Sequence, residues 1–231
     1  RHLDGLIEGV ESLRALVGRI GESYVIQGDS AKPGYGRIQA LLELVGKRYT
    51  GSGVLSSALA MDKAMSKRVF FDAGVPTPRW SLRRAGEPVG DADLAACGGL
   101  PIVVKPNEEG STVGRSIVRS PADLPGALRA AAAYGPEILV EEYIEGREVT
   151  VSVLGDRALP VVEIRPKSGF YDYRSKYTAG MSEYFCPADL PELLDGRVEE
   201  EDRRDGARGG GGGSRQGRCG GAGARAHAAF L

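Results

Sequence analysis

The most constraining feature of the sequence is an apolar strand that ends on a lysine and opens into a loop containing glycine and serine. The strand is Ile102 to Lys105, and the loop runs from Asn107 to Gly114. A short β-branched segment bounded by Pro and Gly is typical of a buried strand. A buried ammonium is costly without an anionic partner, and such a loop lets backbone N–H groups approach a ligand closely. The combination predicts a phosphate site.

An acidic segment, Glu141 to Glu148, follows later in the chain. Carboxylates accept hydrogen bonds and do not donate them when ionised, so they suit the amino and hydroxyl donors of a nucleotide. Together with Lys105, this segment predicts a nucleotide held between a cationic loop and an acidic strand edge. The alternative for both features is structural: a strand-end lysine that reaches solvent, and a solvated acidic edge.

Composition limits the possible classes of protein. The chain has 231 residues, 42% hydrophobic and 26% charged, with a net charge of −1. These values fit one or two globular domains and give no reason to expect a nucleic-acid or membrane partner. The three cysteines are far apart in the sequence, which favours reduced thiols in the cytoplasm over disulfides and gives no metal-ligand spacing. The sequence shows neither a membrane-spanning apolar run nor a signal-peptide pattern.

Hydrophobic periodicity and turn residues predict an α/β (α+β) fold. A helix is expected over 37–45, a strand and turn over 47–53, and one long helix over 56–72 that Gly74 ends. Further helices are expected over 91–96 and 120–134. Strands are expected over 79–83, 102–105, 115–119, 138–143, 148–154 and 159–164, with a hairpin turn at 155–156. The segment 166–186 is predicted to be a long loop, of the kind that often forms a lid.

Both ends of the chain give weaker patterns. Residues 1–36 carry only a short stripe typical of an amphipathic helix, and a further helix is expected to begin at 191. Residues 201–231 are dominated by Gly, Arg and Ala and include a run of five glycines. Such a composition buries too little apolar surface to offset the entropy of ordering, so this tail is predicted to be disordered.

Four motifs in order resemble those of the D-alanine–D-alanine ligases of the ATP-grasp superfamily. They lie at 51–63, 104–114, 141–148 and 171–177. The resemblance implies an ATP-grasp fold with a central small subdomain at 63–140 and a partial C-terminal antiparallel-sheet subdomain at 141–200. Residues 1–62 would be a remnant of the N-terminal substrate domain, of which 1–36 do not resemble the family.

The resemblance implies six ATP-binding residues: Lys63, Lys105, Glu141, Tyr143, Ile144 and Glu148. The two lysines would hold the phosphates. Glu141 would accept a hydrogen bond from the adenine amino group, and the backbone of Tyr143 and Ile144 would bind the ring edge. Glu148 would accept hydrogen bonds from the ribose hydroxyls.

The resemblance also implies residues that act on the substrates. Ser111 would close over phosphate and substrate. In the loop 167–186, which resembles the family's ω-loop, Lys176 would contact the γ-phosphate, while Tyr171 and Tyr177 would lock the lid and the substrate pocket. Tyr177 favours D-alanine over D-lactate as the second substrate. The implied reaction joins two D-alanines through an acyl-phosphate, using ATP and Mg²⁺, to make a peptidoglycan precursor.

The sequence departs from the family at both ends. Residues 1–36 lack the family's N-terminal glycine-rich loop, and the tail after Glu200 lacks the Arg-Val-Asp and Glu-x-Asn motifs whose side chains hold two Mg²⁺ ions. No metal ligands are therefore assigned, and we expect this chain to be inactive or impaired. Our hypothesis for the tail is that it is translated from a shifted reading frame of the gene. The family is usually homodimeric through its N-terminal domain, which makes a dimer doubtful here.

Three alternatives remain open from the sequence. The chain could be another ATP-grasp carboxylate–amine ligase with a different acceptor, against which the Lys176–Tyr177 pair argues. It could be an ATP-binding module without catalytic activity. It could also be the product of a gene that is not expressed, in which case a sheet lacking its partners would expose apolar faces and aggregate.

Overall fold

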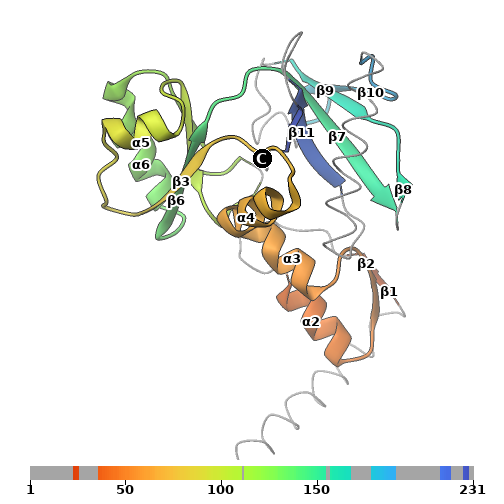
Figure 1. Cartoon of the computed structure of the whole chain (residues 1–231). Coiled ribbons are helices and arrows are strands. Elements are labelled where there is room, and N and C mark those ends of the chain that lie inside the picture. Colours follow the sequence, from red (N-terminus) through yellow and green to blue (C-terminus); the bar gives the residue numbers. More distant parts are fainter. Residues whose placement is uncertain are drawn as a thin grey trace, which may run out of the picture.

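The computed structural model describes residues 23–25, 36–110, 112–154, 157–167, 178–190, 214–219 and 226–228, with only the backbone at 23–25, 214–219 and 226–228. Figure 1 shows two main sheets and a group of helices beside them. The elements in chain order are β1 (Ser23–Val25), α2 (Arg37–Leu44), β2 (Arg48–Thr50), α3 (Val54–Met61), α4 (Lys63–Ala73), β3 (Trp80–Arg84), α5 (Asp91–Ala96), β4 (Ile102–Pro106), β5 (Ser116–Val118), the 3-10 turn η1 (Pro121–Asp123), α6 (Leu124–Ala132), β6 (Glu137–Glu142), β7 (Arg147–Leu154), β8 (Arg157–Ala158), β9 (Val162–Pro166), β10 (Ser182–Phe185), β11 (Ser214–Cys219) and β12 (Ala226–Ala228).

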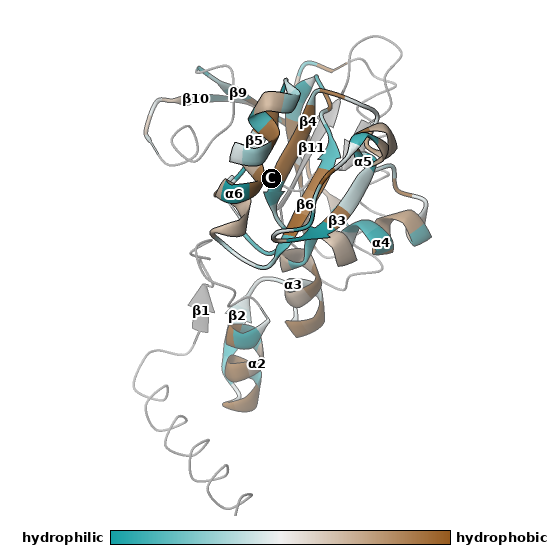
Figure 2. Ribbon diagram, turned by 90° about the vertical axis from the view of Figure 1, so that its left-hand side faces the viewer, coloured by the Kyte–Doolittle hydropathy of each residue, from teal (hydrophilic) through white to brown (hydrophobic). Residues whose placement is uncertain are grey.

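The central sheet is antiparallel and has the strand order β3-β6-β4-β5. Figure 2 shows hydrophobic stretches on β4 and β6, the two inner strands of this sheet. One face of this sheet packs against α6 in a core made of Cys97, Ile102, Val104, Val118, Leu124, Ala127, Ala131, Ile138 and Val140. Because side chains alternate along a strand, the residues between these core positions point to the opposite face. The candidate site is built on that opposite face.

The single helix predicted over 56–72 is wrong, because the structure has two helices, α3 and α4, in this region. The chain leaves the helical conformation at Asp62, whose φ of −92° and ψ of 101° separate α3 from α4. The Asp62 carboxylate accepts a hydrogen bond from the backbone N–H of Met65 at 2.9 Å, as an N-cap does. Gly74 ends α4 at a φ of 73°, as predicted. The break places Lys63 in the first turn of α4.

The second sheet has the strand order β10-β9-β7-β11-β12, with β8 also paired to β7. The strand predicted over 159–164 corresponds to β9, but the predicted start is wrong, because residues 159–161 are not in a strand. A separate short strand, β8, precedes them, and both strands pair with β7. The chain between them keeps one bond to β7, from the Leu159 N–H to the Ser152 carbonyl at 2.8 Å. Val149 and Val151 of β7 form a buried cluster with Val161 and Ala188, which lie just outside the strands.

Two regions predicted to be irregular contain strands. Part of the long loop predicted over 166–186 is β10, which pairs with β9 from Ser182 opposite Pro166 to Phe185 opposite Glu163. In the tail, β11 pairs with β7 and β12 pairs with β11. Strand pairing uses backbone N–H and C=O groups and needs no apolar side chain, which explains why composition missed these strands.

Other expectations agree with the structure or lie outside its described part. The helix predicted over 120–134 begins with η1, where the Ser120 hydroxyl accepts from the Ala122 N–H at 3.3 Å, and continues as α6. The helices expected within 1–36 and after 191 fall outside the described residues. None of the helices in the described part of the chain has the length and apolarity that crossing a membrane requires.

Candidate functional site

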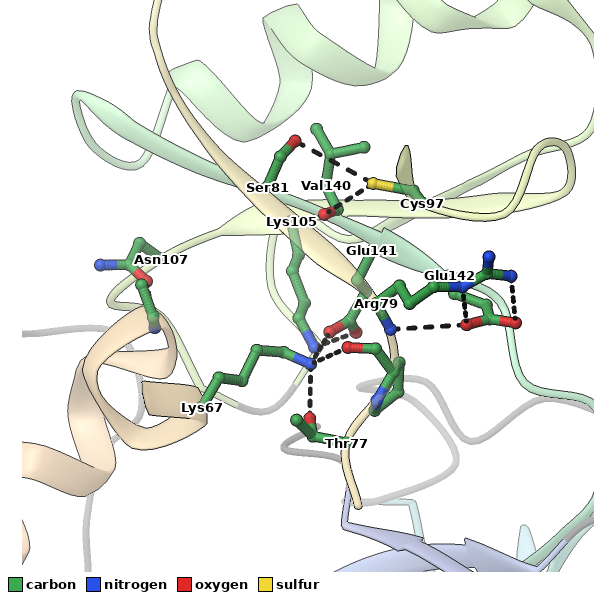
Figure 3. Close-up of polar contacts among 12 residues, drawn as sticks. Lys67, Thr77, Arg79, Ser81, Cys97, Lys105, Asn107, Val140, Glu141 and Glu142 are labelled. Atoms are coloured by element: carbon green, nitrogen blue, oxygen red, sulfur yellow. Dashed lines mark hydrogen bonds and ion pairs between the residues drawn. The ribbon is translucent and has the colours of Figure 1, made fainter. Parts of the chain in front are cut away.

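Lys105 and Glu141 lie on neighbouring strands and point to the same face of the central sheet. In the register of β4 and β6, Lys105 is opposite Leu139 and Val103 is opposite Glu141. The ammonium and the carboxylate are therefore diagonal neighbours, and Nζ of Lys105 lies 2.5 Å from Oε1 of Glu141 (Figure 3). Their side chains are only 4% and 6% exposed. The sequence predicted an anionic partner for Lys105, and the structure supplies this carboxylate.

Lys67 is a third member of this buried charge cluster and was not predicted. It comes from α4, and its Nζ lies 3.0 Å from Oε2 of Glu141, with its side chain 3% exposed. It also donates to the Thr77 hydroxyl at 2.7 Å and to the Pro78 carbonyl at 3.1 Å. Lys67 follows Lys63 by four residues on one helix, so the two lysines share a helix face. That spacing was the sequence signal for its location.

Lys63, a predicted phosphate ligand, is the first residue of α4, and its ammonium group contacts the first residues of the loop that follows β4. Its Nζ donates to the backbone carbonyl of Asn107 at 3.0 Å and also to that of Glu109. The residue is buried, with 5% of its surface exposed. Lys63 therefore joins the N-terminus of α4 to the first turn of the glycine- and serine-containing loop.

Asn107 was not predicted as a site residue, yet it connects three parts of the site. Its Oδ1 accepts from the Ala64 N–H at 2.9 Å, and its Nδ2 donates to Oδ1 of Asp62 and Oε2 of Glu137, both at 3.0 Å. The Asn107 residue is 1% exposed. These contacts hold the end of β4 against α4 and β6, and so fix the position from which the loop begins.

The loop itself has a backbone that restricts the choice of residues. Gly114 has a φ of +65°, and a Cβ there would lie 2.7 Å from Cδ2 of Tyr134 and 2.8 Å from Cγ of Pro106. Thr112 has a φ of +64°, which a β-branched residue rarely adopts. Such backbone strain clusters at ligand sites. Ser111, between these features and β4, lies outside the described residues.

The charges of the cluster are unequal, because two ammonium groups share one carboxylate. Burial alone raises the pKa of Glu141, but the ammonium groups of Lys105 and Lys67 lower it to about 2. Burial lowers the pKa of Lys105 to about 7, with neighbouring cations adding to the shift and Glu141 opposing it. Burial likewise lowers the pKa of Lys63 to about 8. A buried group with excess positive charge is stabilised by an anionic ligand.

The predicted acidic edge is spread over two strands and the connection between them. Glu141 ends up inside the lysine cluster, while Glu148 is buried on β7, opposite Ile164 of β9. Tyr143 lies in the connection, where its N–H donates to the Pro101 carbonyl at 3.3 Å and its ring faces the Arg119 guanidinium at 5.5 Å. Ile144 follows it and is half-buried.

The remaining predicted residues, Tyr171, Lys176 and Tyr177, lie outside the described residues. Within the described part of the chain, no three His, Cys, Asp or Glu side chains come together so that they could hold a metal ion. We therefore assign no step to Mg²⁺.

A cavity of about 350 Å³ lies near the site but does not contain it. Its lining residues are Arg84, Pro106, Glu108, Tyr134, Gly135, Pro136 and Glu137. None of the three lysines or Glu141 belongs to this lining, and its charges are mixed. We place the candidate site at the lysine cluster, because that is where buried positive charge is in excess.

Comparison with known proteins shows which family the chain belongs to. The sequence profile of the family described as D-ala D-ala ligase C-terminus matches residues 69–204. A D-alanine–D-alanine ligase from Geobacter sulfurreducens is 50% identical over 167 residues, which make up 72% of this chain and 52% of that protein. The chain spans between 52% and 58% of the length of the first curated relatives it matches.

Solved structures share the fold. The D-alanine–D-alanine ligase from Bacillus anthracis superimposes with a TM-score of 0.76 at 27% identity, over 94% of this chain and 70% of that one. The VanG D-Ala:D-Ser ligase from Enterococcus faecalis gives a TM-score of 0.71 at 29% identity, over 84% and 59%. The fold is thus the ATP-grasp fold of these ligases. With a profile match over more than half of its residues, the chain belongs to the D-alanine–D-alanine ligase family.

Proposed function

We propose that this chain carries the ATP site of an enzyme that joins two D-alanines through an acyl-phosphate, for peptidoglycan precursor synthesis. The phosphates would bind at Lys63 and Lys105, and the adenine would lie beside Glu141 and the backbone of the connection at 143–144. Glu148 would accept hydrogen bonds from the ribose hydroxyls. Ser111 and the loop carrying Tyr171, Lys176 and Tyr177 would close over the reacting groups and exclude water.

The observation that carries the proposal is the buried cluster in which Lys105 and Lys67 share Glu141, with Lys63 on the same helix as Lys67. Burying more ammonium groups than carboxylates is costly in a protein whose only task is to fold. The negative charge of a polyphosphate would offset that cost. In phosphoryl transfer the protein chiefly positions groups and stabilises charge, which is what such a cluster can supply.

The second substrate is proposed to be D-alanine, on the basis of Tyr177. The VanG neighbour is named for a D-Ala:D-Ser activity, so D-serine is the acceptor to compare. The central subdomain at 63–140 and the partial C-terminal subdomain at 141–200 are proposed to hold the nucleotide between them.

Two measurements separate binding from turnover. Isothermal titration with ATP and Mg²⁺ tests the nucleotide site, and we expect saturable binding that Lys105→Met weakens measurably. Phosphate release with ATP, Mg²⁺ and D-alanine or D-serine tests ligation, with a relative of full length as positive control. Because the sequence lacks the two motifs named above, little turnover is expected from this chain. Absence of ATP binding to the folded chain would refute the proposed nucleotide site.

A further inference from the structure

Lys67 has a buried ammonium group that makes two hydrogen bonds and one ion pair within the protein. An ammonium has three donors. Those of Lys67 face Oε2 of Glu141 at 3.0 Å, the hydroxyl of Thr77 at 2.7 Å and the carbonyl of Pro78 at 3.1 Å (Figure 3). Because three protein oxygens lie within 3.1 Å of its Nζ, we do not assign Lys67 to a phosphate. Its contacts tie it to Glu141 on one side and to the segment before β3 on the other.

The position of Lys105 creates a conflict that Lys67 can resolve. On the proposed function, Lys105 binds phosphate and Glu141 accepts from the adenine amino group. In the structure these two side chains bind each other at 2.5 Å. A phosphate oxygen would compete for the Lys105 donors, and Glu141 would then lose one of its two cations. A buried carboxylate left without a cation tends to take up a proton, and a protonated oxygen is a poorer acceptor.

We propose that Lys67 is a positioning residue for the nucleotide base. When phosphate takes over Lys105, Lys67 stays paired with Oε2 of Glu141. The carboxylate therefore stays ionised, and its Oε1 is available to the adenine amino group. This inference rests on the proposed function and assigns Lys67 a role that differs from phosphate binding. The two lysines therefore have different roles. Lys105 exchanges Glu141 for phosphate when the nucleotide binds, whereas Lys67 stays paired with Glu141.

The role predicts selectivity for one kind of base. Adenine carries an amino donor at C6, whereas hypoxanthine carries a carbonyl acceptor there. An ionised carboxylate attracts the donor and repels the acceptor. The chain should therefore prefer ATP to ITP, and the preference should depend on Lys67. A merely structural role for Lys67 would affect both nucleotides alike.

The test is titration calorimetry of the whole chain with ATP and with ITP, each with Mg²⁺. We expect the wild type to prefer ATP. Lys67→Met should weaken ATP binding about tenfold, the scale of one charge-assisted hydrogen bond, and leave ITP binding nearly unchanged. Lys67→Arg should retain part of the preference. Lys105→Met is the matched control, because losing a phosphate contact should weaken both nucleotides by the same factor.

The remaining outcomes of these titrations would each overturn either the role of Lys67 or the proposed function. An unchanged ATP-to-ITP ratio in Lys67→Met, or equal weakening of both nucleotides, overturns the proposal. If that variant does not fold, Thr77→Val removes one acceptor of Lys67 and keeps its charge; it should lower the ratio in the same direction, and an unchanged ratio again overturns the proposal. A wild type that binds ATP and ITP equally refutes the role of Glu141 and the inference with it. A wild type that binds neither nucleotide refutes the proposed function itself.

Discussion

Lys105 and Glu141 are diagonal neighbours on antiparallel strands, and their charged atoms lie 2.5 Å apart on the sheet face opposite α6. The same carboxylate contacts Lys67, so its removal would take from two buried ammonium groups the anion that they share. This arrangement ties the stability of the central sheet to the chemistry of the candidate site. It also makes the consequences of substitution measurable without any ligand.

Glu141→Gln should destabilise the chain strongly, because breaking a buried ion pair by removing one partner costs about 3–5 kcal/mol. Urea unfolding measures the loss. The matched control is Glu142→Gln, one residue further along β6. Its carboxylate pairs with an Arg79 side chain that is 59% exposed. Exposed pairs contribute little, so this variant should unfold near the wild-type midpoint. Equal losses in the two variants would contradict the buried cluster.

The low pKa of Glu141 predicts that the free energy of unfolding decreases in acid. The pKa of Glu141 is lowered from 4.5 to about 2 in the folded chain. Its contribution to the free energy of unfolding is therefore fully present above pH 4.5 and is lost as the pH falls toward 2. Unfolding of wild type and Glu141→Gln at a series of pH values should show their difference shrinking across this interval. A difference that stays constant down to pH 2 would refute the assignment.

Nucleotide binding should take up protons at mildly alkaline pH. The pKa values of Lys105 and Lys63 are lowered to about 7 and about 8, so both lysines are partly deprotonated at pH 8. A polyphosphate favours the charged forms and raises both pKa values on binding. Calorimetry in buffers of different ionisation enthalpy should give net proton uptake at pH 8 that disappears below pH 6. Uptake that is the same at both pH values would be inconsistent with these lysines as ligands.

Gly114→Ala should destabilise the loop after β4 by about 1–3 kcal/mol, the scale of backbone strain at such positions. The added Cβ would meet Tyr134 and Pro106, and the φ of +65° disfavours any L side chain. Gly126→Ala is the control, because Gly126 lies in α6 and a Cβ there meets nothing within 4 Å. That variant should gain about 0.4–1 kcal/mol. Thermal unfolding of the two variants should therefore shift in opposite directions.

Features of the fold that neighbouring residues determine could be predicted from the sequence. The strand ending on Lys105, the helix cap at Ser120 and the stop at Gly74 are set by neighbouring residues, and the structure has them where the sequence predicted them. The break at Asp62 was missed because apolar periodicity continues through it, although an aspartate before a helix is itself an N-cap signal. Lys67 was missed for a different reason. Its meaning depends on Glu141, which only the fold brings near.

The tail shows the limit of composition more clearly. A Gly- and Arg-rich segment has no alternation from which a strand could be predicted. The backbone of β11 nevertheless pairs with β7 over the whole segment from Ser214, opposite Ser152, to Cys219, opposite Arg147. The decisive partner is the edge of a strand far away in the sequence, and its hydrogen bonds do not depend on residue type. Composition therefore predicted the lack of a core in the tail but not its pairing.

Asn107 offers a test of whether the site is organised by polar contacts. Its side-chain amide donates to the carboxylates of Asp62 and Glu137 and accepts from the Ala64 N–H. Asn107→Asp is nearly isosteric, but at neutral pH it would place a third carboxylate against those two. We expect it to be more destabilising than Asn107→Ala, which removes the contacts at a cost of about 1–3 kcal/mol without adding charge.

The pH dependence separates repulsion from simple loss of packing in this pair of variants. Repulsion raises the pKa of the new carboxyl group in the folded state, so the folded chain binds its proton more tightly than the unfolded chain does. Lowering the pH through that raised value should restore stability to Asn107→Asp relative to Asn107→Ala, which shares every other titrating group. Urea midpoints of both variants between pH 7 and pH 4 measure this gap. A gap that does not narrow, or an aspartate variant as stable as the alanine variant at pH 7, would show that Asn107 does not hold these two carboxylates together.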